Sequence, residues 1–164
     1  MKRIIVTTLI ATISLATPAL AEPDWQAVGE ALGKEGTVQP DGIYRVGLPR
    51  SDLKVQLDGV EIKPALALGT WLAFQPVGDT EAMVMGDLVL MQDEVNPVLS
   101  ELLDAGLEVT ALHNHFFFDD PKVYFMHVAG EGALAAVAQR VRNAVDKVKE
   151  LRAKGAPAPG SGTR

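Results

Sequence analysis

Apolar residues recur along this chain with two different periods, which predict helices and strands. The longest helical pattern covers residues 133–154, where apolar side chains return every three or four positions and charged side chains occupy the opposite side. Such a segment buries one stripe against a partner, so we expect a helix that packs on a sheet. The stripe consists of Leu134, Val137, Ala138, Val141, Val145, Val148 and Leu151.

Two shorter helices are predicted after Asp24 and after Asn96. Asp24 is a suitable N-cap, and Gly33 is suited to end the first helix. Asn96 is the expected N-cap of the second helix, with Pro97 at the first helical position and Gly106 at the end. Their apolar stripes are Trp25, Val28 and Leu32 in the first helix and Val98, Leu99, Leu102 and Leu103 in the second.

Runs of β-branched and aliphatic residues predict strands over most of the remaining chain. Asp58-Gly59 suits the positive φ angles of a two-residue hairpin turn. Gly78-Asp79 joins two longer strands, and we expect a β-bulge at Gly86-Asp87 in the second of them. The predicted strands cover residues 43–48, 54–57, 60–63, 66–77 and 81–91.

Every histidine of the chain lies in one further hairpin, predicted from residues 109–118 and 123–128 with turn residues between them. Side chains alternate along a strand, so His113 and His115 share one face. A tight turn would place His127 opposite His113 or His115 on that same face. The three imidazoles would then converge on one site.

The order of these elements predicts an α+β fold with a mostly antiparallel sheet and helices packed on one of its faces. From residue 81 onward the order is strand, helix, strand, strand, helix, which is that of a ferredoxin-like half. The earlier strands extend this unit.

Both ends of the chain are predicted to lie outside the folded domain. Lys2 and Arg3 precede an apolar run, and Ala19-Leu20-Ala21 carries the small residues that a signal peptidase recognises. A periplasmic or secreted protein is therefore expected, with no membrane span after cleavage. The predicted parts are a signal peptide over residues 1–21, a single α+β domain over residues 22–154 and a flexible tail over residues 155–164.

The composition excludes several kinds of site. The 164 residues include no cysteine, which excludes disulfides, thiolate ligands and a cysteine nucleophile. Removal of Lys2 and Arg3 with the signal peptide changes the formal net charge from −6 to −8, and no basic cluster is present, so nucleic acid is not an expected partner. No nucleophilic serine elbow and no glycine-rich phosphate loop is found.

Three imidazoles on one face are a ligand set that transition metals use, because neutral imidazole suits Zn and Cu and leaves a coordination position open. His113, His115 and His127 are therefore candidate metal ligands, with Zn or Cu as the candidate ion. Glu94 is the candidate additional ligand. Methionines 83 and 85 share one strand face and are expected in the core, although thioethers are also soft ligands for Cu(I).

Three runs of residues carry a resemblance: 93–98 (DEVNPV), 106–115 (GLEVTALHNH) and 125–132 (FMHVAGEG). Together they resemble the LppY/LpqO family of exported bacterial proteins of unknown function. The resemblance implies export and a single-domain unit, and it supplies no activity. The chain departs from relatives that are lipoproteins, since it has no cysteine, and from relatives with a second copy of the domain.

Three classes of function fit these observations. The first is an exported module that binds a metal ion or a small molecule on its histidine face. The second is a metal-assisted or histidine-based hydrolase-type enzyme that uses the open coordination position. The third is a structural or interaction domain in which the histidines are incidental. The pattern leaves the oligomeric state open.

Overall fold

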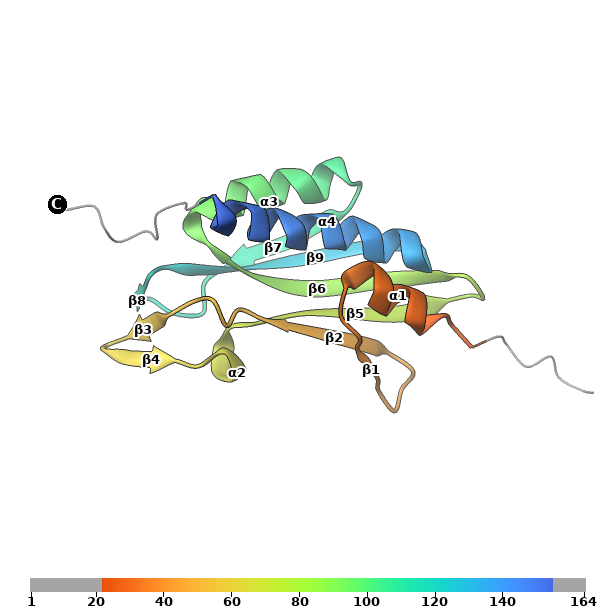
Figure 1. Cartoon of the computed structure of the whole chain (residues 1–164), viewed down its shortest axis with the longest axis horizontal. Helices are drawn as coiled ribbons and strands as arrows, with labels where there is room; N and C mark the ends of the chain where they lie inside the picture. Colours follow the sequence, from red (N-terminus) through yellow and green to blue (C-terminus); the bar gives the residue numbers. More distant parts are fainter. Residues whose placement is uncertain (1–21, 155–164) are drawn as a thin grey trace, which may run out of the picture.

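The computed structural model of the protein describes residues 22–154, so the predicted signal peptide and tail lie outside the described residues (Figure 1). In chain order the elements are α1 (Trp25–Leu32), β1 (Thr37–Val38), β2 (Tyr44–Pro49), β3 (Val55–Leu57), β4 (Val60–Ile62), α2 (Pro64–Ala67), β5 (Gly69–Val77), β6 (Glu81–Met91), α3 (Gln92–Asp104), β7 (Glu108–His113), β8 (Asp119–Asp120), β9 (Val123–Ala133) and α4 (Leu134–Ala153).

The main sheet of the described chain has six strands in the order β1-β2-β5-β6-β9-β7, and every neighbouring pair is antiparallel. Its centre is the long pair of β6 and β9, which stay in register from Glu81 opposite Ala133 to Met91 opposite Val123. Strand β9 lies between β6 and β7, which are joined through α3. This is the split β-α-β arrangement of a ferredoxin-like half, so the predicted α+β class and element order are confirmed.

The helices α1, α3 and α4 lie along one face of this sheet (Figure 1). The α4 stripe is buried there as predicted, with Val137 and Val141 fully inaccessible, against Val28 of α1 and Val98 of α3. No helix within residues 22–154 is both long and apolar enough to cross a membrane.

A smaller sheet, in the order β4-β3-β8, packs with α2 against the other face at one end. The predicted hairpin around Asp58-Gly59 is confirmed, with φ angles of 50° and 79° at these two residues. Val89 and Met91 of β6 and Phe125 of β9 form the second hydrophobic cluster beneath this small sheet. The rest of this face, which we call the open face, is not covered by any described element.

Two elements begin at other residues than predicted, because proline and asparagine signals were assigned to the wrong structural positions. The strand predicted over residues 66–77 begins only at Gly69, because Pro64 starts a single helical turn before it. Helix α3 begins at Gln92 rather than after Asn96, and Pro97 lies inside it. The Glu94 carboxylate accepts a hydrogen bond from the Met91 N–H at 2.7 Å and thereby caps the earlier start.

The predicted β-bulge at Gly86-Asp87 is wrong, because β6 pairs continuously with both neighbours through these residues. Gly86 is required there for close packing. A Cβ atom at this position would lie 2.6 Å from Leu72 Cδ2 and 2.9 Å from the Trp71 carbonyl oxygen.

The histidine hairpin also differs from the prediction. Strand β7 ends at His113 instead of continuing to Phe118, and the connection to β9 contains β8, which pairs with β3 of the small sheet. The Asp119 carboxylate accepts hydrogen bonds from the Val123 N–H at 2.8 Å and from Lys122 Nζ at 2.7 Å. This long connection therefore ties the hairpin to the small sheet.

Candidate histidine site

The histidines lie on the open face, next to the edge of the small sheet. His127 of β9 is opposite Asp87 of β6, and His113 at the end of β7 is opposite Phe125 of β9. Partners across a ladder share a face, so these side chains lie on the side turned away from α3 and α4. Met126, which alternates with them on β9, is fully buried in the helix-side core.

A shift of register in β7 decides where His113 points. The pairing of β7 with β9 moves by one residue between Val109 and Ala111, which leaves Thr110 as a bulge. Without this shift His113 would face the helices, because a displacement of one residue moves a side chain to the other face. His113 and His127 do share a face as predicted, but His127 lies opposite Ala111 and not opposite another histidine.

The rings of His113 and His127 are in direct contact. Their Nε2 atoms are 2.9 Å apart and their ring centroids 5.0 Å. Two nitrogen lone pairs repel at this distance, so one Nε2 must carry a proton or a cation must lie between the two atoms. Both side chains are half-buried, which keeps the pair accessible from solvent.

His115 lies just beyond β7 and completes a stack of rings. It covers Phe125, with centroids 3.4 Å apart and ring planes at 7°, and it is 5.2 Å from the His113 ring. Partial burial, together with the neighbouring charge of His113, lowers the pKa of His115 below its usual 6.5. This shift favours the neutral imidazole, which is the form that ligates metals.

Asp87 is the carboxylate that accompanies the histidines, and the sequence patterns did not identify it as a site residue. The residue is 8% exposed, its Oδ2 lies 3.9 Å from His127 Nε2, and its buried Oδ1 has no hydrogen-bond partner in the described structure. A buried carboxylate oxygen without a partner is unfavourable, and functional sites are one place where such atoms occur. Its signal in the sequence is a lone acidic residue inside an apolar strand.

The expectation that Glu94 joins the histidines is wrong, because both of its oxygens are held elsewhere. Arg50 donates to Glu94 Oε2 at 2.8 Å and to Oε1 at 3.0 Å, and Arg152 Nε lies 2.7 Å from Oε1. The Met91 N–H also donates a hydrogen bond to Oε2, and Glu94 is completely buried. Glu94 is a structural anion between two arginines.

The open face around the cluster carries exposed apolar side chains. Met83 and Met85 of β6 are 40% and 47% exposed, so the expectation that they belong to the core is wrong. They lie on the same face of β6 as Asp87, because they are separated from it by even numbers of residues. Phe117 and Phe118, in the connection after β7, are 90% and 76% exposed.

The cluster combines three imidazoles and one carboxylate, but it is not a finished coordination site. Within residues 22–154 no three His, Asp or Glu side chains are already arranged to hold a metal ion. The His115 ring would have to rotate away from the Phe125 ring on which it is stacked. The two close Nε2 atoms would have to separate to about 3.4 Å, as tetrahedral ligands at about 2.1 Å require. Both adjustments are side-chain rotations at the protein surface.

Comparison with known proteins assigns a family and no activity. Residues 26–147 match the family described as Domain of Unknown Function (DUF1259). No curated protein and no solved structure gives a significant match.

Proposed function

We propose that this chain, which belongs to the family described as Domain of Unknown Function (DUF1259), binds a transition-metal ion on its open face. His113 and His127 are the central ligands, and His115 and Asp87 complete the set. The observation that carries the proposal is the contact of all three histidines of the chain beside a buried, unpartnered Asp87 oxygen.

The chemistry of these groups favours a cation over other small ligands. The His113–His127 pair needs a proton or a cation between its nitrogens, and the Asp87 carboxylate brings a negative charge next to it, with Oδ2 3.9 Å from His127 Nε2. Three nitrogen donors and one oxygen donor suit Zn²⁺ and Cu²⁺, whereas Mg²⁺ and Ca²⁺ prefer oxygen ligands alone. We therefore propose Zn²⁺ or Cu²⁺ as the ion.

Titration calorimetry of the chelator-treated protein with ZnCl₂ and with CuCl₂ tests the proposal. The His113→Ala and His127→Ala variants should each lose the site, because too few ligands remain. The His115→Ala and Asp87→Asn variants should bind at least about tenfold more weakly, the range found when a supporting group is removed. Circular dichroism checks that the variants are folded.

The matched control is Glu131→Gln, which removes a carboxylate from the same sheet face without touching the histidines. Glu131 lies opposite Met83, four residues along β9 from His127. This variant should bind like the wild type. Equal binding by the wild type and the two central histidine variants, or no binding tighter than that of the His113→Ala variant, would overturn the proposal.

The proposal includes export, as the signal-peptide pattern and the resemblance to the LppY/LpqO family suggest. Cleavage before Glu22 would deliver residues 22–164 to the periplasm or the medium. Mass spectrometry of the exported protein should find Glu22 at its N-terminus, and material that retains residues 1–21 would contradict the proposal.

A further inference from the structure

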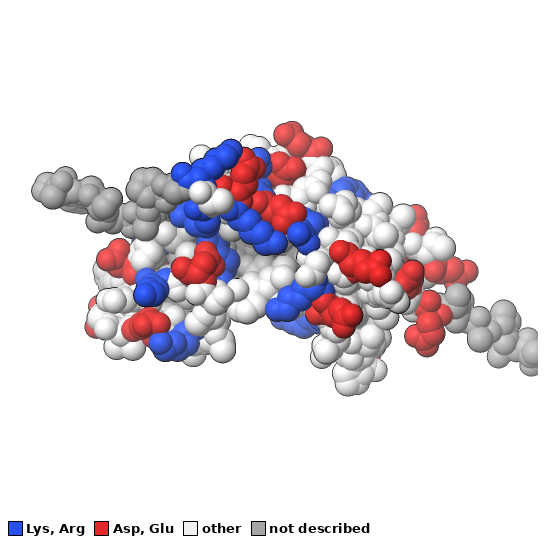
Figure 2. Space-filling model, in the orientation of Figure 1, with Lys and Arg blue, Asp and Glu red and all other residues white. Residues whose placement is uncertain are grey.

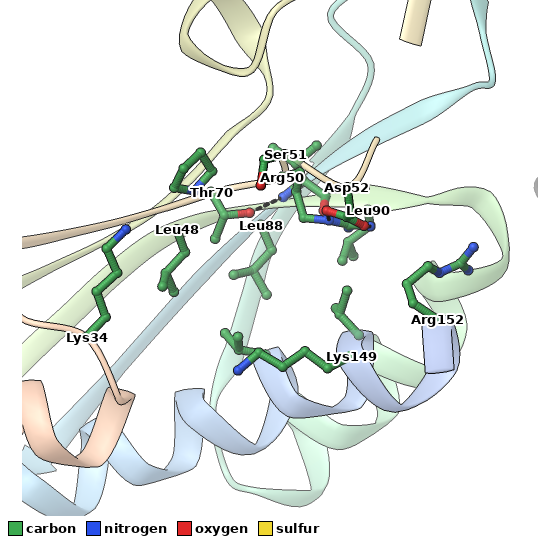
Figure 3. Close-up of a pocket in the computed structure, with 14 residues that line it drawn as sticks. Lys34, Leu48, Arg50, Ser51, Asp52, Thr70, Leu88, Leu90, Lys149 and Arg152 are labelled. Carbon is green, nitrogen blue, oxygen red and sulfur yellow. Dashed lines mark hydrogen bonds and ion pairs between the residues drawn. The ribbon is translucent and has the colours of Figure 1, made fainter. Parts of the chain in front are cut away.

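A cavity lies on the helix side of the main sheet, away from the histidines. It is bounded by α4 and by β2, β5 and β6, and its volume is about 540 Å³ (Figure 3). This is within the range of about 300–1,000 Å³ found for small-molecule sites. Figure 2 shows a hollow below α4 whose floor is uncharged, with both basic and acidic side chains at its margin.

The inner wall of the cavity is apolar. Leu48 of β2, Leu88 and Leu90 of β6 and Val145 and Val148 of α4 line it. Val145 and Val148 are only partly buried, whereas Val141, one turn earlier on α4, is fully buried. The last turns of α4 therefore stand off from the sheet, and the gap is the cavity.

The charges around the cavity differ from those of the whole protein. The chain has a net charge of −6, yet four basic residues and one acidic residue line this cavity. The basic residues are Lys34, Arg50, Lys149 and Arg152, and the acidic residue is Asp52. Charge complementarity therefore favours an anionic ligand.

The arginines of this set are already committed to protein partners. Arg50 donates five hydrogen bonds, two to Asp52, two to Glu94 and one to the Val89 carbonyl oxygen. Arg152 is held by Asp93 and Glu94. These two side chains line the cavity, and their ion pairs hold that part of its wall in place.

The two lysines are available at the mouth. Lys34 is exposed and makes no ion pair with any described residue. The Lys149 side chain is 62% exposed, and within residues 22–154 its one ion pair is with Asp146, at 3.1 Å, a surface contact of small free energy. In Figure 3 the Lys34 amino group lies beside the strands near Leu48, and the Lys149 amino group lies on the α4 side of the cavity; both lie away from Arg50.

We infer that this cavity binds a small amphipathic carboxylate. The apolar chain of the ligand lies between α4 and the leucines of β2 and β6, and its carboxylate meets the amino groups of Lys34 and Lys149. One charged end and an apolar body match the single basic mouth and the apolar wall. A phosphate-rich or sugar-like ligand would leave most of its polar groups unpaired against this wall.

Titration calorimetry with decanoate, decanol and butyrate separates the two parts of the site. Decanoate should bind, decanol should bind at least about tenfold more weakly for lack of the charge, and butyrate should give no measurable heat for lack of apolar contact. Equal affinity for decanoate and decanol, or no binding of decanoate, overturns the inference.

Two variants and a charge-matched control locate the site. The Lys34→Gln/Lys149→Gln variant should bind decanoate at least about tenfold more weakly, whereas Lys63→Gln/Lys147→Gln, which removes the same charge away from the cavity, should bind like the wild type. Val148→Trp should fill the cavity and abolish binding.

Lys34, Lys63 and Lys149 are exposed and Lys147 is partly buried, so we expect the lysine variants to fold and to remain informative even if Val148→Trp does not fold. Equal binding by both lysine double variants overturns the inference. The His113→Ala variant should bind decanoate normally, which separates this site from the proposed metal site.

Discussion

Two buried carboxylates, Asp87 and Glu94, have different partners in the folded chain. Glu94 is hydrogen-bonded on both oxygens to arginines and to the backbone. Asp87 Oδ1 has no partner among the described residues, and its Oδ2 lies 3.9 Å from His127 Nε2. A buried anion that is fully paired supports the fold, and removal of one partner leaves the others uncompensated. A buried anion with a free oxygen is instead available to a cation.

The Glu94→Gln variant should therefore lose stability and keep metal binding. We expect a loss of about 3–5 kcal/mol in the free energy of unfolding, because the buried Arg50 loses one of its two anionic partners and keeps only Asp52. Urea denaturation measures this loss. Glu101→Gln on the same helix is the control and should change the free energy by less than about 0.5 kcal/mol, because Glu101 is at the surface. A stable Glu94→Gln variant with weakened metal binding would restore Glu94 as a ligand.

Two strand glycines differ in what surrounds them, and this gives a second prediction at the residue scale. A Cβ at Gly86 would meet Leu72 and the Trp71 carbonyl, whereas a Cβ at Gly47 would have nothing within 4 Å. Gly86→Ala should cost about 1–3 kcal/mol through overpacking. Gly47→Ala should be neutral or slightly stabilising, because alanine restricts the unfolded chain. Thermal melts of the two variants that agree within error would contradict the packing role of Gly86.

At the scale of elements, α4 holds the helix layer on the sheet. Its stripe packs against α1 and α3 and against the central strands. The pattern of burial follows the apolar period of the sequence, and the buried residues are Leu134, Val137, Ala138, Val141 and Ala144. The docking of α4 also forms one wall of the cavity.

Val141→Asp should destabilise the protein by several kcal/mol, because it places an unpaired charge at a fully buried position. Denaturation monitored by circular dichroism measures the loss. Asn143→Asp introduces a carboxylate on the exposed side of the same helix and should melt with the wild type. Equal melting of Val141→Asp and Asn143→Asp would mean that α4 does not dock on the sheet.

At the scale of the whole molecule, acidic side chains form ion pairs and hydrogen bonds with basic side chains around the cavity and along α4. Hydrogen bonds from Arg50 lower the pKa of Asp52 below its usual 3.8. Hydrogen bonds from Lys154 and Lys147 lower the pKa of Glu150 from 4.5 to about 2. Because folding lowers both pKa values, the resulting stability is complete above pH 4.5 and is lost as the pH falls toward 2.

The melting temperature should therefore fall between pH 4.5 and pH 2, and the fall should be shallower in Asp52→Asn and Glu150→Gln. Scanning calorimetry at several pH values measures this. Added salt should weaken the Glu150 contribution most, because its pairs are exposed to solvent. A variant profile that runs parallel to that of the wild type would contradict the assignment for that residue.

The sequence alone determined most elements and the α+β class. The period of α4, the cap at Asp24 with Gly33, the Asp58-Gly59 turn and the full extent of β6 follow from residues within the same segment. Such signals depend on residues that are close together in the chain, so they can be recognised in a single sequence. The early start of α3 was missed because its N-cap is Met91, which is not one of the residue types that signal a cap, whereas Asn96-Pro97 further along is such a signal.

Only the tertiary structure determined where the residues of the two proposed sites lie. The bulge at Thr110 turns His113 to the face of His127, and a single step of register changes the face of every later side chain in a strand. Asp87 and His127 are neighbours because β6 pairs with β9. The cavity lies between α4 and the strands β2, β5 and β6, which are far from α4 in sequence. The sequence identified the histidines as candidate ligands, but the pairing of distant strands determined which residues lie next to them.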